Sequence, residues 1–97
     1  MAYDPGQIEA TLAAAVGEDP VLLAELRVAF VEGVNRAADA FDQASSTEEW
    51  RAAAARLRGL AGSFGAVRLM ALAAEASDAA VGDRAIRKRL RRAIDRL

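Results

Sequence analysis

The 97-residue sequence contains neither cysteine nor histidine. A chain without cysteine has no disulfide, no thiolate metal ligand and no thiol nucleophile. A chain without histidine lacks the commonest general acid or base, the commonest metal ligand and any Ser-His-Asp triad. We therefore expect a protein that is not an enzyme and that has no catalytic residue, no metal site and no cofactor.

Long apolar runs are also missing. No stretch reaches the roughly 18 apolar residues of a membrane-spanning helix, and the first residues, MAYDPGQ, lack the basic region and apolar stretch of a secretory signal. The length suits one compact domain, since domains most often contain about 100 to 150 residues. We expect a single cytoplasmic domain over residues 1–97 that does not contact a membrane.

Alanine is the most abundant residue and occupies 25 of the 97 positions. It has the highest helix propensity, and its small side chain lets helices pack closely. No strand-like alternation, proline-rich linker or low-complexity tract interrupts the chain. The composition therefore predicts an all-α fold.

Start and stop signals divide the chain into five helices. Asp4 and Asp19 each stand before a proline at a first helical position, Ser46 and Glu49 have capping-box spacing, and Gly65 is a C-terminal stop. The expected helices cover about residues 5–16, 20–43, 47–64, 67–81 and 84–97. Short loops between them predict an antiparallel up-down-up-down four-helix bundle, with a short additional N-terminal helix over one end.

The four long helices each carry an apolar stripe at helical spacing, which predicts the core. The stripes consist of Leu23, Leu26, Phe30, Val34, Ala37, Phe41, Trp50, Ala53, Ala54, Leu57, Leu60, Ala61, Phe64, Leu69, Leu72, Ala73, Ala76, Ala80, Ile86, Leu90, Ala93, Ile94 and Leu97. We expect these side chains to meet inside the bundle.

Charge is divided unevenly along the chain, although the formal net charge is only −1. Residues 1–50 hold ten acids and two bases, whereas residues 84–97 hold one acid and seven bases. We interpret this asymmetry as an acidic helix that packs beside a basic helix. The acids expected to offset the last helix are Glu25, Glu32, Asp39 and Asp42.

A second interpretation is that the basic last helix binds the phosphates of nucleic acid. The bases concerned are Arg84, Arg87, Lys88, Arg89, Arg91, Arg92 and Arg96. We do not favour nucleic acid as a partner, because no helix-turn-helix pattern or aromatic stacking platform accompanies these bases.

The helix expected over residues 47–64 has an outer face without large side chains. On a helical wheel, the side opposite Leu57 holds only alanine and glycine: Ala52, Ala55, Gly59, Gly62 and Ala66. A mid-helix glycine costs about 1 kcal/mol relative to alanine, so two of them on one face need a reason. They either admit a neighbouring helix of the same bundle, or leave room for a partner, or form a self-association face.

Four polar residues border this outer face, with Arg51 and Arg58 on one side and Arg56 and Ser63 on the other. The arginines give the smooth strip a cationic rim. Such a strip suits an apolar partner helix or an acidic pocket.

Residues 55–66, with the sequence ARLRGLAGSFGA, resemble the signature of histidine-containing phosphotransfer (HPt) domains. That signature reads His-x-Leu-Lys-Gly, then several small residues, then Gly-Ala. The matching residues are Leu57, Arg58, Gly59, Gly65 and Ala66, with arginine in place of the usual lysine. The resemblance covers nearly the whole chain and implies a four-helix bundle that works in a two-component phosphorelay.

Ala55 occupies the position of the family's phosphoaccepting histidine. A methyl group cannot hold a phosphoryl group, and a phosphoester of the nearby Ser63 would be too stable for a relay, with no base to form it. The resemblance therefore implies a pseudo-HPt domain that regulates or scaffolds by binding. Alternatively, the natural protein does transfer phosphoryl groups, and Ala55 replaces its histidine by design.

The resemblance also implies that the docking surface is kept. In the family, the glycine at the position of Gly59 clears space around the imidazole, and the base at the position of Arg58 steadies the phosphoryl group. The implied partner of this monomer is a response-regulator receiver domain, a histidine kinase or both. The expected partner-binding residues are Arg51, Ala55, Arg56, Arg58, Gly59, Gly62, Ser63 and Ala66.

Overall fold

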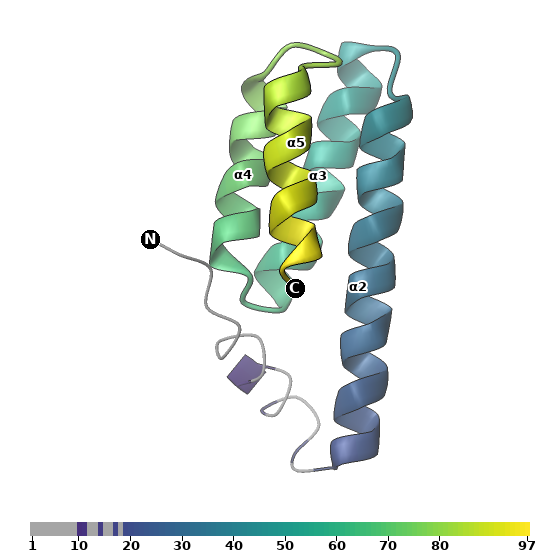
Figure 1. The fold of residues 1–97 in the computed structure, drawn as a ribbon, viewed down its shortest axis with the longest axis vertical. Coiled ribbons are helices and arrows are strands. Elements are labelled where there is room, and N and C mark those ends of the chain that lie inside the picture. The colour runs from purple at the N-terminus through teal and green to yellow at the C-terminus, as the bar shows by residue number, and fades with distance from the viewer. Residues whose placement is uncertain (1–9, 12–13, 15–16, 18) are drawn as a thin grey trace.

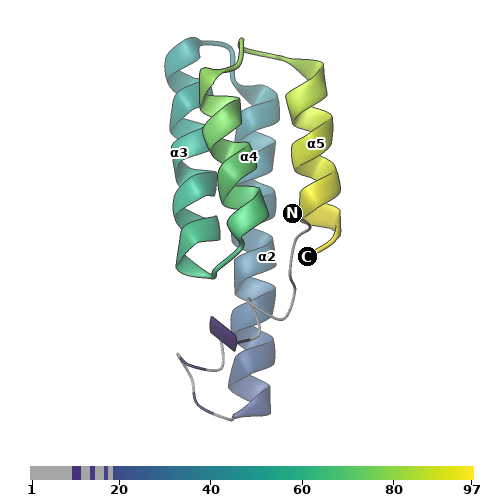
Figure 2. The ribbon, with the colours of Figure 1, turned by 90° about the vertical axis from the view of Figure 1, so that its left-hand side faces the viewer.

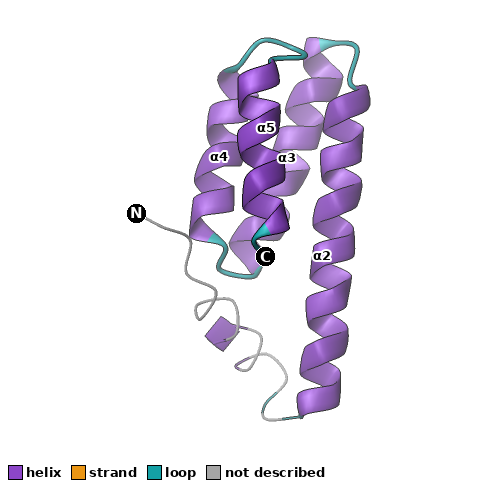
Figure 3. Ribbon diagram, viewed as in Figure 1, coloured by secondary structure: helices purple, strands orange, loops and turns teal. Residues whose placement is uncertain are grey.

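The computed structural model describes residues 10, 11, 14, 17 and 19–97, and the helix expected over about residues 5–16 lies largely outside this part of the chain. Residues 19–97 form four helices and no strand (Figures 1 and 3). The helices are α2 (Pro20–Gln43), α3 (Thr47–Ser63), α4 (Val67–Asp78) and α5 (Arg84–Asp95). The prediction of an all-α four-helix bundle is confirmed for these residues.

The four helices pack in a ring. Helix α3 lies between α2 and α4, and α5 closes the ring by contacting both α4 and α2. The α2–α3 and α4–α5 connections lie at one end of the bundle and the α3–α4 connection lies at the other (Figures 1 and 2). Helix α2 is the longest and extends past its neighbours at its N-terminal end (Figure 1).

Side-chain caps fix three of the helix starts. The Asp19 carboxylate accepts from the backbone N–H groups at the start of α2, and Asp83 accepts from Ile86 N at 3.0 Å at the start of α5. Ser46 Oγ accepts from Glu49 N at 3.1 Å. In a capping box, the Glu49 carboxylate would accept from the backbone N–H of Ser46. Here it accepts instead from the backbone N–H and the hydroxyl of Ser45. These hydrogen bonds lower the pKa of Glu49.

Helix α4 ends three residues earlier than its apolar pattern predicts. After Asp78 the backbone turns extended at Ala79, and the N–H of Asp83 closes a turn onto the carbonyl of Ala80. Gly82 supplies the left-handed conformation of this turn, with a φ of 80°. The prediction that Ala80 belongs to the core is therefore wrong, because its side chain lies on an exposed turn.

Trp50 is at the centre of the core and is fully buried. Its ring lies against Phe41 of α2, with 3.8 Å between ring centroids, and its Nε1 donates to the carbonyl oxygen of Ala76 in α4 at 2.7 Å. A second aromatic contact joins Phe30 to Phe64 at 4.5 Å. One tryptophan on α3 thus connects both neighbouring helices and leaves no polar atom unpaired.

The remaining predicted core residues are buried or half-buried. The half-buried ones, which pack against the buried cluster, are Leu23, Leu26, Leu60, Phe64 and Leu97. Small residues make up much of this cluster, which lets the helices lie close together.

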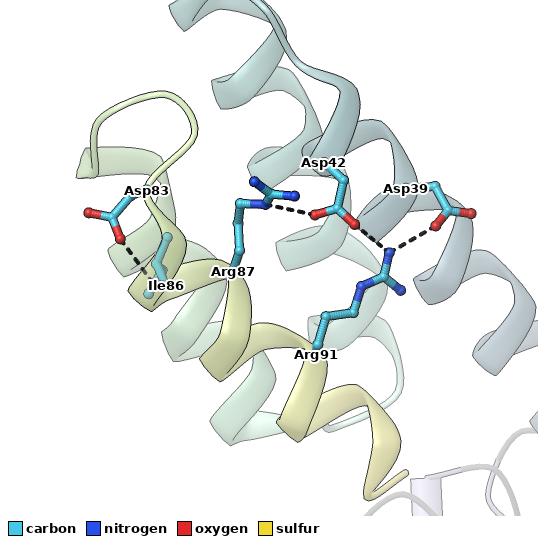
Figure 4. Close-up of polar contacts among 6 residues, drawn as sticks. All are labelled: Asp39, Asp42, Asp83, Ile86, Arg87 and Arg91. Atoms are coloured by element: carbon cyan, nitrogen blue, oxygen red, sulfur yellow. Dashed lines mark hydrogen bonds and ion pairs between the residues drawn. The ribbon is translucent and has the colours of Figure 1, made fainter.

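The acidic α2 and the basic α5 lie side by side and are joined by ion pairs (Figure 4). The Nη2 atom of Arg91 donates to both Asp39, at 2.8 Å, and Asp42, at 2.7 Å. Arg87 Nε donates to Asp42 at 3.0 Å. Partial burial alone would raise the pKa of Asp42, but the hydrogen bonds and charges of Arg91 and Arg87 outweigh it and lower the pKa. The predicted pairing of acidic and basic helices is confirmed for these residues.

Candidate docking groove between α3 and α4

A groove of about 530 Å³ runs between α3 and α4. Most of its lining side chains are alanine, glycine or serine, and the larger ones are Arg58, Met70 and Asp78. The full lining consists of Ala54, Ala55, Arg58, Gly59 and Gly62 from α3 and Met70, Ala73, Ala74, Ser77 and Asp78 from α4. The groove exists because small side chains face one another across two helices.

The structure explains the presence of glycine at one of the two α3 positions but not at the other. A Cβ added at Gly62 would lie 3.3 Å from Met70 Sδ, so this glycine admits the side chain of a neighbouring helix. A Cβ added at Gly59 would meet nothing within 4 Å. Packing within the bundle therefore accounts for Gly62, whereas Gly59 only widens the groove.

Opposite charges stand on the two walls of the groove. Arg58 belongs to α3 and Asp78 to α4, and the side chains of both are exposed. Neither forms an ion pair or a side-chain hydrogen bond with any residue in the described part of the chain. Both charges are thus available to a partner that enters the groove.

The structure gathers four of the expected partner-binding residues in the groove: Ala55, Arg58, Gly59 and Gly62. Arg51 is exposed on α3 but does not line the groove. Arg56 faces the other way and lines a separate hollow of about 420 Å³ between α2 and α3. The Ser63 hydroxyl donates to the carbonyl of Gly59 at 2.9 Å, inside its own helix.

Ala66 is wrongly predicted to share the exposed face of α3. The helix ends at Ser63, and Gly65 redirects the chain with a φ of 72°. Ala66 then begins α4, is fully buried, and donates its N–H to the carbonyl of Ala61 at 2.9 Å. A helical wheel does not apply beyond Ser63, because the chain leaves the helix there and turns Ala66 into the core.

The sequence analysis predicts binding residues on α3 only and does not identify the α4 wall of the groove. The sequence does contain a sign of this wall, because the small residues Ala74 and Ser77 lie next to the apolar core residues of α4. Both are half-buried, which is typical of a helix side next to an open groove. Asp78 completes this wall at the last turn of α4.

Small side chains and two opposite charges define the chemistry of the groove. The chain has no histidine or cysteine, and the described residues contain no acidic cluster that would hold a metal ion. A smooth wall with one cation and one anion at its rim suits close approach of a protein segment.

None of the helices in the described residues combines the length and the apolar content needed to cross a membrane. Comparisons of the chain with protein-family models, with curated proteins and with solved structures give no match.

Proposed function

We propose that this chain is an HPt-like module of a two-component phosphorelay that binds a response-regulator receiver domain or a histidine kinase and does not itself accept phosphate. It acts by occupying its partner, either as a regulator or as a scaffold. The observation that carries the proposal is Gly59, which is exposed on the groove and has no internal contact to explain it. The proposal includes the antiparallel up-down-up-down topology of an HPt domain.

The groove geometry supports docking of a partner helix. Side chains at Ala55 and Gly59 stand one turn apart on its α3 wall and are no larger than a methyl group. A partner backbone can therefore approach α3 closely, as small residues permit between helices generally. Arg58 lies beside them and forms no ion pair with any residue that the structure describes, so it offers a cation to an acidic receiver pocket.

The test is a titration of the isotope-labelled protein with the receiver domains and kinase domains encoded in the same genome. We expect saturable binding of at least one of them with a Kd of about 1–100 μM, and shifts centred on residues 54–62 and 70–78. Gly59→Glu should weaken this binding by about tenfold or more, because it fills the groove and adds a charge that opposes an acidic pocket.

The matched control is Ala29→Glu, which adds the same charge at an exposed position of α2 outside the groove. It should leave the affinity unchanged. Absence of binding at about 1 mM for every domain tested, or equal weakening by both variants, would contradict the proposal.

The alternative, a phosphotransfer domain whose histidine has been replaced, has one observation in its favour. Ala55 is exposed on the groove, so an imidazole in its place would face an incoming phosphoryl donor. Ala55→His, mixed with a phosphorylated receiver that binds the protein, should then form an acid-labile phosphohistidine. Reading the genomic codon for position 55 decides between a natural and a designed alanine.

A further inference from the structure

Five bases at the end of the chain fall into two groups, one facing α2 and the other facing α4. Arg87 and Arg91 point to α2 and are neutralised by Asp39 and Asp42 (Figure 4). On the α4 side, a hollow of about 130 Å³ is lined by arginines from two helices over the methyl group of Ala93. These are Arg68 of α4 and Arg89, Arg92 and Arg96 of α5, and we call them the α4–α5 arginine cluster.

The α5 members of this cluster have few acidic partners among the described residues. Arg89 pairs with Glu75 at 2.9 Å, but both side chains are about half exposed, so water weakens the attraction. The side chains of Arg92 and Arg96 form no ion pair or hydrogen bond within residues 19–97. No acid in the described residues therefore neutralises the charges of Arg92 and Arg96.

The start of α4 adds to the positive potential. Ala66 provides no side-chain cap, and the first turn contains no acid. It contains Arg68 instead, although the positive end of a helix dipole normally favours an anion. The uncapped start of α4 lies at the same end of the bundle as the last turn of α5, to which Arg92 belongs (Figure 2).

We propose that the α4–α5 arginine cluster binds the phosphate group of a small ligand. Guanidinium groups match the oxygens of phosphate in paired hydrogen bonds, and several guanidinium groups together favour a doubly charged phosphate over a singly charged carboxylate. The hollow, of about 130 Å³, is lined by four arginines and one alanine, so guanidinium groups are its main polar groups. No aromatic side chain lines it, so it lacks the stacking surface typical of single-stranded nucleic acid sites.

This site does not depend on the α3–α4 groove. Helix α4 separates the two, with α3 on one side and α5 on the other (Figure 2). The groove lining and the cluster have no residue in common. A ligand at the cluster therefore leaves the groove free.

The test uses inorganic phosphate as the probe and follows the backbone and arginine side-chain signals of the labelled protein at low ionic strength. We expect saturable shifts confined to the cluster, with a Kd of about 1 mM or below. Acetate should bind about tenfold more weakly or not at all, since it carries one charge and two oxygens. Arg92→Ala/Arg96→Ala should weaken phosphate binding by about tenfold or more.

The matched control is Arg84→Ala/Lys88→Ala, which removes the same charge from exposed positions of α5 that do not line the hollow. It should change the affinity by less than about twofold. Equal weakening by both double variants, equal affinity for acetate, or shifts that do not saturate would overturn the proposal. Binding of duplex DNA about a hundredfold tighter than phosphate, with a steep salt dependence, would instead assign the cluster to nucleic acid.

Discussion

The α3–α4 face and the α2–α5 face of this bundle are built from opposite kinds of side chain. Across the first, small residues leave a groove of about 530 Å³ whose rim charges, Arg58 and Asp78, form no ion pair with each other or with other described residues. Across the second, Asp39, Asp42, Arg87 and Arg91 satisfy one another. The comparison shows that charge density alone does not mark a binding surface, because charges already paired within the chain have little left for a partner.

The largest loss of stability is expected from removing the tryptophan at the centre of the core. Trp50→Ala should lower the free energy of unfolding by about 3–5 kcal/mol, because it empties the core and leaves the Ala76 carbonyl without its donor. Urea unfolding followed by circular dichroism measures this loss. Trp50→Phe keeps an aromatic ring and should lose less, and a loss below about 1 kcal/mol for Trp50→Ala would contradict the role given to this residue.

A smaller loss of stability is expected from removing the ion pairs between α2 and α5. Asp42→Asn removes the carboxylate shared by Arg87 and Arg91 and should cost about 1 kcal/mol at pH 7 and low salt. Glu32→Gln is the matched control, since Glu32 has no ion pair within the described residues and its replacement should cost almost nothing. Equal losses for the two variants would mean that the network does not stabilise the fold.

The same ion pairs predict how the stability of the fold changes with pH. The pKa of Asp42 is lowered in the folded protein, so the folded state binds this proton less readily than the unfolded state. Its stabilising contribution is fully present above the unfolded pKa of about 3.9 and is lost as pH falls through the lower folded pKa. The stability difference between the parent protein and Asp42→Asn should therefore shrink as the pH falls below the unfolded pKa, and a difference that grows in acid would contradict a charge effect.

The two glycines of α3 offer a comparison within the groove itself. Gly59→Ala should raise the free energy of unfolding by up to about 1 kcal/mol, because its Cβ enters open space in a helix. Gly62→Ala should gain less, because its Cβ would lie 3.3 Å from Met70 Sδ and the methionine must shift. Thermal unfolding of both variants checks the order, and a larger gain at Gly62 would reverse the assignment.

The smallest effect is expected on the oligomeric state. The groove is proposed to receive a different protein, so the parent protein and Gly59→Leu should both have the mass of a monomer by light scattering at about 100 μM. A dimer in the parent that dissociates in Gly59→Leu would make this face a self-association surface instead.

Helix starts could be predicted from the sequence because their causes are local. Asp19, Ser46 and Asp83 each accept a hydrogen bond from an N–H two or three residues ahead, so short stretches of sequence contain the whole signal. Helix ends were less predictable. Apolar periodicity continues through Ala66 and Ala80, although the backbone has already left the helix at both positions.

The partners of charged residues depend on how helices are rotated, which a single sequence does not give. Four acids on α2 were expected to offset α5, but ion pairs join only Asp39 and Asp42 to it in the described structure. Glu32 is ten residues before Asp42, which places it about 80° away around the helix. The α4 wall of the groove was missed for a similar reason, since Ser77 and Asp78 reach the site only through the packing of two helices.

Trp50 gives the molecule an internal optical and magnetic reporter. It is the single tryptophan of the chain and lies one helical turn before Ala54, which lines the groove, while its indole N–H is bonded to the opposite helix at Ala76. Any partner that spreads α3 from α4 must lengthen this hydrogen bond. The indole proton resonance and the emission of one fluorophore will therefore distinguish a ligand that rests on a rigid groove from one that opens it.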